Sequence, residues 1–499
     1  MPCLNERQSI PGAIMKINSG ITLALVLAAS LVCPHLSADT ITEKNVEKAR
    51  AVIEAAVAAH GGEAGLDSIE TMIVKHDSIG YAVDQSRGTE APWDETKQPG
   101  LDAIEFGSDV FYTYNEFDGS GFQGVNATII DGKDSYQIDH RAGTLQRISE
   151  PDYDTTSGPF IRVTATALVR TLGDRAGNAH YLGEATVDDV TYDVVGFSMA
   201  VGPAISLYFD QEDHLLRRSE RVLPNFGLVQ YEWSDYEEID GFTVAKTFRF
   251  YFNGDLNIHR KLVDVRFNEP LDELLAVNDD LLEIDELTPD ELSRQEIADD
   301  VWLIGGNGTY AMFVDMGDYI FAAGGIAGIP ERIESLREVV GEKPIRYGML
   351  THHHFDHVVG VQPYESIDAT IIAAKAHEKI ARRAAADDDA LKLKTVEDRM
   401  TLTGDNRTVE IIDIGPTAHS EHLLVAYLPD EGILFEADHF ALPRVGPIPP
   451  AVESTRSFAA ALRRLELDVE YILSAHSPKA ATMDDLQTAI STMVSQATQ

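Results

Sequence analysis

The chain has 499 residues, and 82 acidic side chains against 40 basic ones give it a formal net charge of −42 at pH 7. A surface this acidic repels phosphate backbones, which argues against a nucleic-acid partner and against nuclease activity. The length predicts roughly two or three domains. The 44% hydrophobic content is sufficient for stability by core burial.

Residues 15–38 have the pattern of a secretory signal peptide. Met15-Lys16 supplies a positive start, residues 21–32 form an apolar core, and Leu36-Ser37-Ala38 is a small-residue cleavage site. The apolar core is too short to remain as a membrane span. We therefore expect a periplasmic or secreted protein without a stable membrane span, whose mature chain begins at Asp39.

The only two cysteines, Cys3 and Cys33, lie before or within this leader, so the mature chain is expected to contain no thiol. This excludes a small fold held together by disulfides. Removal of the leader also removes Glu6, Arg7 and Lys16, a net of +1, and changes the formal charge from −42 to −43.

A helix is predicted at the start of the mature chain. Thr40 and Glu43 can form a capping box, and Gly61-Gly62 provides the end signal. Apolar side chains recur on one helical face, at Val46, Ala49, Ile53 and Val57.

After this helix the pattern is mainly that of β-strands. Residues 206–209 and 215–222 flank a polar turn, and residues 246–252 and 257–267 flank Asn253-Gly254, a favoured hairpin turn. Long antiparallel strands with few helices predict a curved sheet or half-barrel. This region is faintly similar to the periplasmic lipoprotein-carrier fold.

We expect a mainly β domain over residues 39–285 and a second domain over residues 296–490, joined by the acidic stretch 272–300. Within the second domain, a helical stretch is predicted from Ala373 to Ala386. His377 in that stretch is expected to be structural rather than functional.

The most informative segment is Thr351-His352-His353-His354-Phe355-Asp356-His357, which directly follows an apolar run. Buried imidazoles lose solvation and repel one another when protonated. Crowding of this kind therefore indicates a divalent cation that binds their lone pairs. Read as His-x-His-x-Asp-His, the segment offers His352 and His354 to one ion and Asp356 and His357 to a neighbouring ion.

Four ligands do not complete two metal sites, so further ligands are expected later in the chain, each after a short β-rich stretch. Loops at strand ends converge in α/β sheets, and their sites lie there. The candidates are His419 after the apolar run 409–414, Asp438 after residues 432–435, and His476 after residues 471–474.

With these ligands in this order, residues 296–490 resemble the metallo-β-lactamase superfamily. The resemblance implies an αβ/βα sandwich, and hydrolysis by a hydroxide that bridges two zinc ions between its two sheets. Asp356 is the candidate catalytic residue, which would orient the nucleophile and pass a proton. The implied assignment is His352, His354 and His419 to the first zinc, Asp356, His357 and His476 to the second, and Asp438 as the bridging ligand.

Two departures from the family pattern limit what the resemblance implies. Residues 322–325 read Ala-Ala-Gly-Gly where most members carry Asp-x-Gly, so a carboxylate next to the metal ligands is missing. Asp438 stands where the best-known β-lactamases of the superfamily have a cysteine, which disfavours antibiotic hydrolysis of that type. A Glu in place of His354 would have indicated a di-iron redox protein, and the imidazole favours zinc.

Three further histidines lie near the ligands in sequence but are expected to stay outside the metal sites. His353 should point away from the ions if its loop is extended. His422 and His439 are expected to be pocket-lining or surface residues.

The predicted fold class is α+β, with the mainly β domain followed by the metallo-β-lactamase sandwich. The predicted function is that of an exported zinc-dependent hydrolase acting on a small molecule, with an ester, lactone or amide bond favoured over a β-lactam, phosphodiester or thioester. A mononuclear iron oxygenase remains the redox alternative, and a non-catalytic carrier of a lipid-like ligand the alternative from another class. The sequence does not indicate an oligomeric state.

Overall fold

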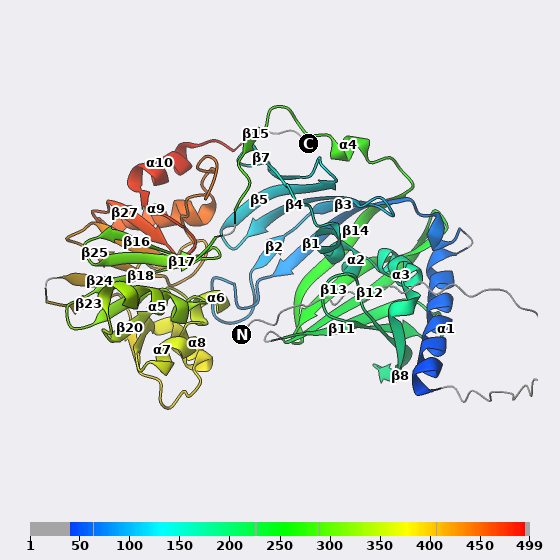
Figure 1. Cartoon of the computed structure of the whole chain (residues 1–499), viewed down its shortest axis with the longest axis horizontal. Helices are drawn as coiled ribbons and strands as arrows, with labels where there is room; N and C mark the ends of the chain where they lie inside the picture. Colours follow the sequence, from blue (N-terminus) through cyan, green and yellow to red (C-terminus); the bar gives the residue numbers. More distant parts are fainter. Residues whose placement is uncertain (1–39, 63, 225–226, 289, 406, 495–499) are drawn as a thin grey trace, which may run out of the picture.

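The computed structural model describes residues 40–62, 64–224, 227–288, 290–405 and 407–494. The predicted signal peptide lies outside these residues. The described chain forms one sheet of 15 strands and two smaller sheets of seven and six strands. Figure 1 shows the large sheet and its helices on one side of the molecule and the two smaller sheets on the other. None of the helices in the described ranges is long and apolar enough to cross a membrane.

The first helix is the one that the sequence predicts. Helix α1 (Ile41–Gly61) begins at the N-cap Thr40, whose side chain forms a capping box with Glu43, and it ends at Gly62 with φ 53°. Ala49 and Ile53 on its apolar face are buried. They pack with α2 (Tyr153–Val163) and α3 (Ala165–Asp174) in the core of the large sheet.

The large sheet is antiparallel apart from one parallel pair, β7 with β15. Both predicted hairpins are present, as β10 paired with β11 and β13 paired with β14. Asn253 and Gly254 turn the second hairpin with φ 50° and 91°. The strands of this sheet are β1 (Thr71–Tyr81), β2 (Glu95–Lys97), β3 (Gly100–Glu105), β4 (Val110–Gly119), β5 (Phe122–Asp131), β6 (Tyr136–Asp139), β7 (Thr144–Arg147), β8 (Ala179–Val187), β9 (Val190–Phe197), β10 (Ile205–Asp210), β11 (Leu216–Leu223), β12 (Gly227–Ile239), β13 (Phe242–Phe252), β14 (Asp255–Phe267) and β15 (Leu282–Ile284).

The two smaller sheets share one hydrophobic core, to which both contribute buried side chains such as Phe313 and Phe435. The first sheet contains β16 (Ser293–Ala298), β17 (Val301–Gly306), β18 (Thr309–Asp315), β19 (Ile320–Ala323), β20 (Ile345–Met349), β21 (Thr370–Ala374) and β22 (Leu393–Val396). The second contains β23 (Arg399–Thr403), β24 (Thr408–Asp413), β25 (Leu424–Leu428), β26 (Ile433–Glu436), β27 (Tyr471–Ser474) and β28 (Ala481–Thr482).

Helices cover the outer faces of these two sheets. Helices α5, α7 and α8 contact the first sheet, and α10 contacts β28 of the second and packs against α9. The arrangement confirms the predicted sandwich that follows a mainly β domain. The helices are α5 (Ile329–Val340), α6 (Phe355–Val358), α7 (Val361–Ser366), α8 (Glu378–Ala384), α9 (Glu453–Leu465) and α10 (Met483–Ser491).

Two stretches differ from the sequence-based expectation. The predicted helix from Ala373 to Ala386 is shorter, because Ala373 and Ala374 end the buried strand β21 and the α-helix is only α8. The acidic stretch 272–300 is a connection only over residues 285–292. Its first part contains α4 (Asp272–Leu275) and β15, and its last part contains β16. The two strands form because β15 pairs with β7 and β16 pairs with β17, which satisfies their backbone groups.

The N-terminal domain, residues 40–284, reaches the C-terminal domain, residues 293–491, through two segments. The bridging loop, residues 82–94 between β1 and β2, accepts a hydrogen bond from the Glu421 amide at the Arg87 carbonyl, 3.0 Å away. The β4–β5 turn, residues 119–122, accepts one from the Ser454 amide at the Gly121 carbonyl, 2.8 Å away. Both segments approach the ends of the strands of the sandwich (Figure 1).

Candidate metal centre

All seven predicted ligands lie just beyond the ends of strands in the C-terminal domain. The segment 352–357 follows β20 of the first sheet, and Asp356 and His357 lie in the short helix α6. His419, Asp438 and His476 follow β24, β26 and β27 of the second sheet. The loops of both sheets therefore bring these side chains together at one end of the sandwich.

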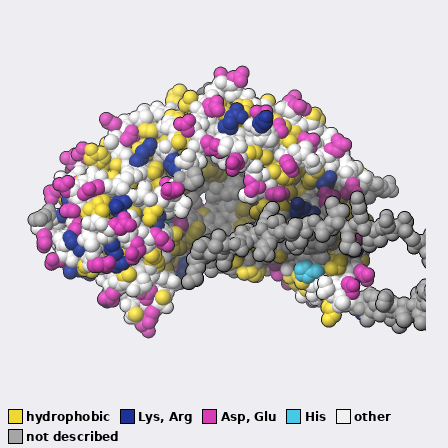
Figure 2. Space-filling view, viewed as in Figure 1, with side chains coloured by type: hydrophobic (Ala, Val, Ile, Leu, Met, Phe, Trp, Pro, Cys, Tyr) yellow, Lys and Arg dark blue, Asp and Glu magenta, His cyan; other side chains and the backbone are white. Residues whose placement is uncertain are grey.

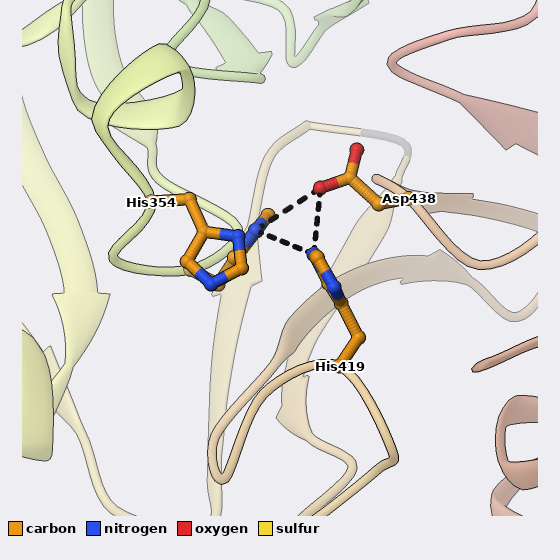
Figure 3. Close-up of side chains that lie close together, drawn as sticks. His354, His419 and Asp438 are labelled. Atoms are coloured by element: carbon orange, nitrogen blue, oxygen red, sulfur yellow. Dashed lines mark hydrogen bonds and ion pairs between the residues drawn. The ribbon is translucent and has the colours of Figure 1, made fainter. Parts of the chain in front are cut away.

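The ligands form two groups in which the ligand atoms all lie within 4.8 Å of one another. The first group contains His352, His354, His419 and Asp438, and the second contains Asp356, His357 and His476. Figure 3 shows His354, His419 and Asp438 pointing toward one another from separate loops.

Asp438 lies between the two groups, with one carboxylate oxygen facing each. Its Oδ2 is 2.9 Å from Nε2 of His419 and 3.1 Å from Nε2 of His352. Its Oδ1 is 3.1 Å from Nε2 of His357 and 2.9 Å from Nε2 of His476. This placement is the one that a ligand shared by two cations requires.

The hydrogen bonding of His354 fits a metal ligand. Its Nε2 lies 2.9 Å from the Ser86 carbonyl oxygen, so this nitrogen carries the proton that is donated there. Its Nδ1 is buried and has no hydrogen-bond partner among the described residues. A buried nitrogen lone pair without a partner is costly in a protein interior, and a bound cation would satisfy it.

Burial and the neighbouring imidazoles keep His352 and His354 in the neutral form that binds metals. Burial, followed by repulsion from His354 and His357, lowers the pKa of His352 well below its usual range. Burial and repulsion from His419 and His353 do the same to the pKa of His354. Neutral imidazoles bind cations without first losing a proton.

The second group has the opposite electrostatics. Burial lowers the pKa of His357, but attraction to Asp438 and hydrogen bonds with Asp356 and Asp438 outweigh it and raise the pKa to about 10. Burial raises the pKa of Asp356, but hydrogen bonds from His357 and Gln85 and the His357 charge lower it to about 2. The two carboxylates thus favour a positive charge at this position, and a divalent cation would displace the proton of His357.

Thr351 contacts both groups from the position before the ligand segment. Its Oγ1 lies 3.2 Å from Nδ1 of His352 and 3.4 Å from Nδ1 of His357, and the residue is fully buried. It can accept a hydrogen bond from each imidazole and so direct both Nε2 atoms toward the metal positions. Strand β19 ends in Ala322-Ala323, so no carboxylate is available there for this role.

The N-terminal domain also holds the ligands in place. Nε2 of Gln85 donates to Oδ1 of Asp356 over 2.9 Å, and Nδ1 of His419 lies 3.2 Å from the Ser120 carbonyl oxygen. The Phe122 ring packs edge-on against His419, with the ring centroids 5.0 Å apart. The bridging loop and the β4–β5 turn therefore complete the surroundings of ligands that the C-terminal domain supplies.

Sequence reasoning missed these partners, and little in the sequence could have revealed them. Gln85 is 271 positions before Asp356, and Ser120 is 299 positions before His419. Ser86 and Ser120 act through backbone carbonyls, which every residue type possesses.

Four other histidines lie close to the site but outside both groups of ligands. Nε2 of His353 lies 3.1 Å from the Gly88 carbonyl oxygen, and the buried His377 ring is 4.7 Å from that of His353. His422 contacts Asp413 at 2.7 Å, and Nε2 of His439 lies 2.9 Å from Oγ1 of Thr417.

A cavity of about 550 Å³ opens onto the ligands. From the C-terminal domain it is lined by Asp356, His419, Asp438 and His476 among others, and from the N-terminal domain by residues of β4, β5 and the β6–β7 turn. The side chains of Asp356 and His476 are 41% and 33% exposed, whereas that of His352 is fully buried. A small molecule in the cavity would therefore meet Asp356 and His476 before it could reach His352.

Residues 324–476 match the family model of the metallo-beta-lactamase superfamily. The matched segment contains all seven ligands and ends at His476. This confirms the resemblance that the sequence predicts and supports a metal-dependent hydrolase.

Solved metallo-β-lactamase structures also superpose on the chain. The enzyme from Pontibacter korlensis is 16% identical, with 40% of this chain and 97% of that chain covered and a TM-score of 0.33. FIM-1 from Pseudomonas aeruginosa, in a mono-zinc form, is 19% identical, with 40% of this chain and 95% of that chain covered and a TM-score of 0.31. The enzyme from Hirschia baltica has the same identity, coverage and score as FIM-1. No curated protein matches the chain.

Proposed function

We propose that this protein, whose residues 324–476 form a metallo-β-lactamase superfamily domain, is an exported zinc-dependent hydrolase that cleaves an ester, lactone or amide bond in a small molecule. The observation that carries the proposal is the position of Asp438 between two groups of ligands. Seven ligand residues are more than one tetrahedral site can use, and a shared carboxylate joins two sites.

The chemistry of the ligands supports zinc as the metal. Five imidazoles and two carboxylates, without a thiolate, make a set of borderline donors that suits zinc better than calcium or magnesium. Zinc, when bound, supplies hydroxide near neutral pH, because it lowers the pKa of coordinated water from about 15.7 to about 7.

Asp356 is the residue that we expect to act on the reacting groups. Its Oδ1 is occupied by the hydrogen bond from Gln85, whereas its Oδ2 faces His357 at 3.4 Å and His476 at 4.0 Å. Its side chain lines the cavity and is partly exposed. Asp356 would therefore orient the nucleophile with Oδ2, take up the proton that the attacking hydroxide loses, and pass it to the leaving group as the bond breaks.

The acidic surface and the apolar residues of the cavity wall favour a small molecule over a nucleic acid as the substrate. Figure 2 shows Asp and Glu side chains spread over the visible face of the molecule, in keeping with the net charge of −42. Such a surface repels polyanions. The cavity wall has several apolar residues, including Phe117, Phe122 and Phe440, which suit a compact molecule with an apolar group.

Export to the periplasm or the exterior is proposed from the pattern of residues 15–38. Mass spectrometry of the mature protein tests this directly. A mature chain that begins at Asp39 is the expected result, and an intact first segment in the cytoplasm would refute export.

Two measurements test the proposed function. Elemental analysis of the purified protein should find close to two zinc ions per chain, and the zinc-loaded protein should turn over at least one member of a panel of esters, lactones, amides, β-lactams and phosphodiesters. A protein that retains only one ion in excess zinc, or that prefers iron, would contradict the binuclear hydrolase. A protein that binds two zinc ions but turns over no member of the panel would favour a carrier role.

A further inference from the structure

The wall of the cavity that the N-terminal domain supplies contains one basic side chain among the described residues. Arg141 follows β6 in the turn to β7, and within the described parts of the chain it is the only Lys or Arg that lines the cavity. The same cavity is lined by Asp356 and His476 of the second ligand group. A molecule bound there can therefore meet the metal ligands and the Arg141 guanidinium at the same time.

The backbone around Arg141 is fixed by Asp139. Oδ1 of Asp139 accepts hydrogen bonds from the amides of Arg141 and Ala142, each over 2.9 Å. This carboxylate oxygen is thereby used within the turn. The Arg141 side chain consequently extends from a short turn whose backbone is fixed by two hydrogen bonds.

The guanidinium of Arg141 forms no hydrogen bond and no ion pair with any residue that the structure describes. The chain as a whole has 82 acidic and 40 basic side chains, yet no carboxylate forms an ion pair with this guanidinium among the described residues. Burial lowers the pKa of Arg141, and attraction to Asp139 offsets this only in part. A partly desolvated cation without a partner binds an anion more strongly than an exposed one does.

The remaining wall beside Arg141 is largely apolar. Phe117 and Phe122 come from β4 and β5, and Phe440, Pro449 and Pro450 come from the loop after β26. A second cavity of about 390 Å³ shares Asn126, Asp139 and Pro449 with the first, so the two cavities are neighbours on the same sheet. This surface suits an aliphatic or aromatic group of several carbon atoms.

We propose that Arg141 is the specificity residue for a carboxylate on the substrate, so that the protein acts on esters or amides that combine a free carboxylate with an apolar group. The inference rests on the proposed hydrolase function and names its substrate class. The N-terminal domain is then the part of the chain that selects the substrate, and the C-terminal domain is the part that binds the metal.

Two matched chromogenic esters test the proposal. 4-Nitrophenyl pentanoate and mono-4-nitrophenyl glutarate have acyl chains of the same length, and the second carries a carboxylate in place of the terminal methyl group. In the zinc-loaded wild type we expect the glutarate ester to have the higher kcat/KM. In Arg141→Gln its KM should rise about tenfold or more, because a charge-assisted hydrogen bond is lost. The KM of the pentanoate ester should change less than twofold in the same variant. Arg141→Lys should have a KM for the glutarate ester between those of the wild type and Arg141→Gln.

Arg147→Gln is the matched control. Arg147 lies six positions further along the same hairpin, is exposed, and bonds to the Lys133 carbonyl and the Tyr136 hydroxyl outside the cavity. Arg147→Gln should leave the KM and kcat/KM of both esters unchanged. Equal losses on the two esters in Arg141→Gln, or no change on either, would overturn the assignment of Arg141.

A binding measurement separates failure of this inference from failure of the proposed function. 4-Phenylbutyrate and the neutral 4-phenylbutyramide are titrated calorimetrically into the zinc-loaded wild type and Arg141→Gln. Preferential binding of the carboxylate that is lost in Arg141→Gln would support the inference even if neither ester were turned over. Carboxylate binding that persists in Arg141→Gln would place the anion on the metals and refute it.

Discussion

The replacement of Gln85 by Leu tests whether the N-terminal domain takes part in the metal centre. In the wild type, Nε2 of Gln85 donates to Oδ1 of Asp356 over 2.9 Å. Leucine has a similar size and removes only the polar end of the side chain. Asp356 would then keep its contacts with His357 and His476 but lose the partner that fixes its orientation.

The expected magnitude follows from the strength of this hydrogen bond. A hydrogen bond to a charged group contributes about 1.5 to 3 kcal/mol, and about 1.4 kcal/mol corresponds to a factor of ten. The Asp356 side chain is 41% exposed, so water replaces part of the lost interaction and the lower end of this range applies. We expect the affinity for the second zinc ion and kcat/KM each to fall about tenfold, within the range of about 10- to 100-fold that is usual for residues behind metal ligands.

Zinc titration against a chromophoric chelator resolves the two binding steps. In Gln85→Leu only the weaker step should shift, because the first group of ligands does not contact Gln85. Gln362→Leu is the matched control, since Gln362 is exposed on α7 and donates to the Ala384 carbonyl away from the ligands. A Gln85→Leu protein with both zinc affinities and kcat/KM within about twofold of the control would refute a role for the bridging loop in the metal centre.

Three further pairs of substitutions address the roles of single residues. Asp356→Asn should abolish turnover while circular dichroism shows an intact fold, because the amide loses the negative charge and cannot accept a proton. His353→Ala should lower turnover much less. Equal losses of turnover in the two variants in saturating zinc would contradict the assignment of Asp356, and not His353, to the metal site. Thr351→Val should weaken the binding of both zinc ions by about 10- to 100-fold in the chelator titration, since it leaves the Nδ1 groups of His352 and His357 without their hydroxyl partner, and Thr351→Ser should behave as wild type. Gly121→Ala should lower kcat/KM, because the added Cβ would lie 3.0 Å from the Ala418 backbone next to His419. Gly132 also has a positive φ, but a Cβ added there would meet nothing within 4 Å. Gly132→Ala should therefore lower only the thermal stability, which a melting curve measures, and leave kcat/KM unchanged.

The features that the sequence predicted correctly are those with local signals. The capping box and the terminal glycines define α1, and Asn253-Gly254 defines the hairpin of β13 and β14. The ligand strands can be recognised because each is a short apolar run with a polar ligand in the loop that follows, as at β26 and Asp438. In each case the residues that determine the structure lie within a few positions of one another.

Features that depend on distant partners could not be predicted. Strand β1 pairs with β14, so that Met72 lies opposite Phe267, and alternation of side chains shows which face of a strand is buried but not which strand lies beside it. The sequence predicts a helix at the end of β21, where the structure has a strand, because a short apolar run fits a buried strand and a buried helix equally well. The position of Arg141 in the cavity likewise depends on how the two domains meet.

The contacts between the domains imply that metal binding and domain packing are thermodynamically coupled. The Ser86 and Ser120 carbonyls face the ring nitrogens of His354 and His419, and Gln85 holds Asp356, so three of the seven ligands have their orientation set by the N-terminal domain. A cation that requires these orientations stabilises the arrangement of the domains that provides them, and by linkage a well-packed interface raises the affinity for the cation by the same factor. The N-terminal domain therefore helps to orient the candidate ligands and forms one wall of the cavity beside them, and we expect a substitution in the bridging loop to change metal affinity without touching a ligand.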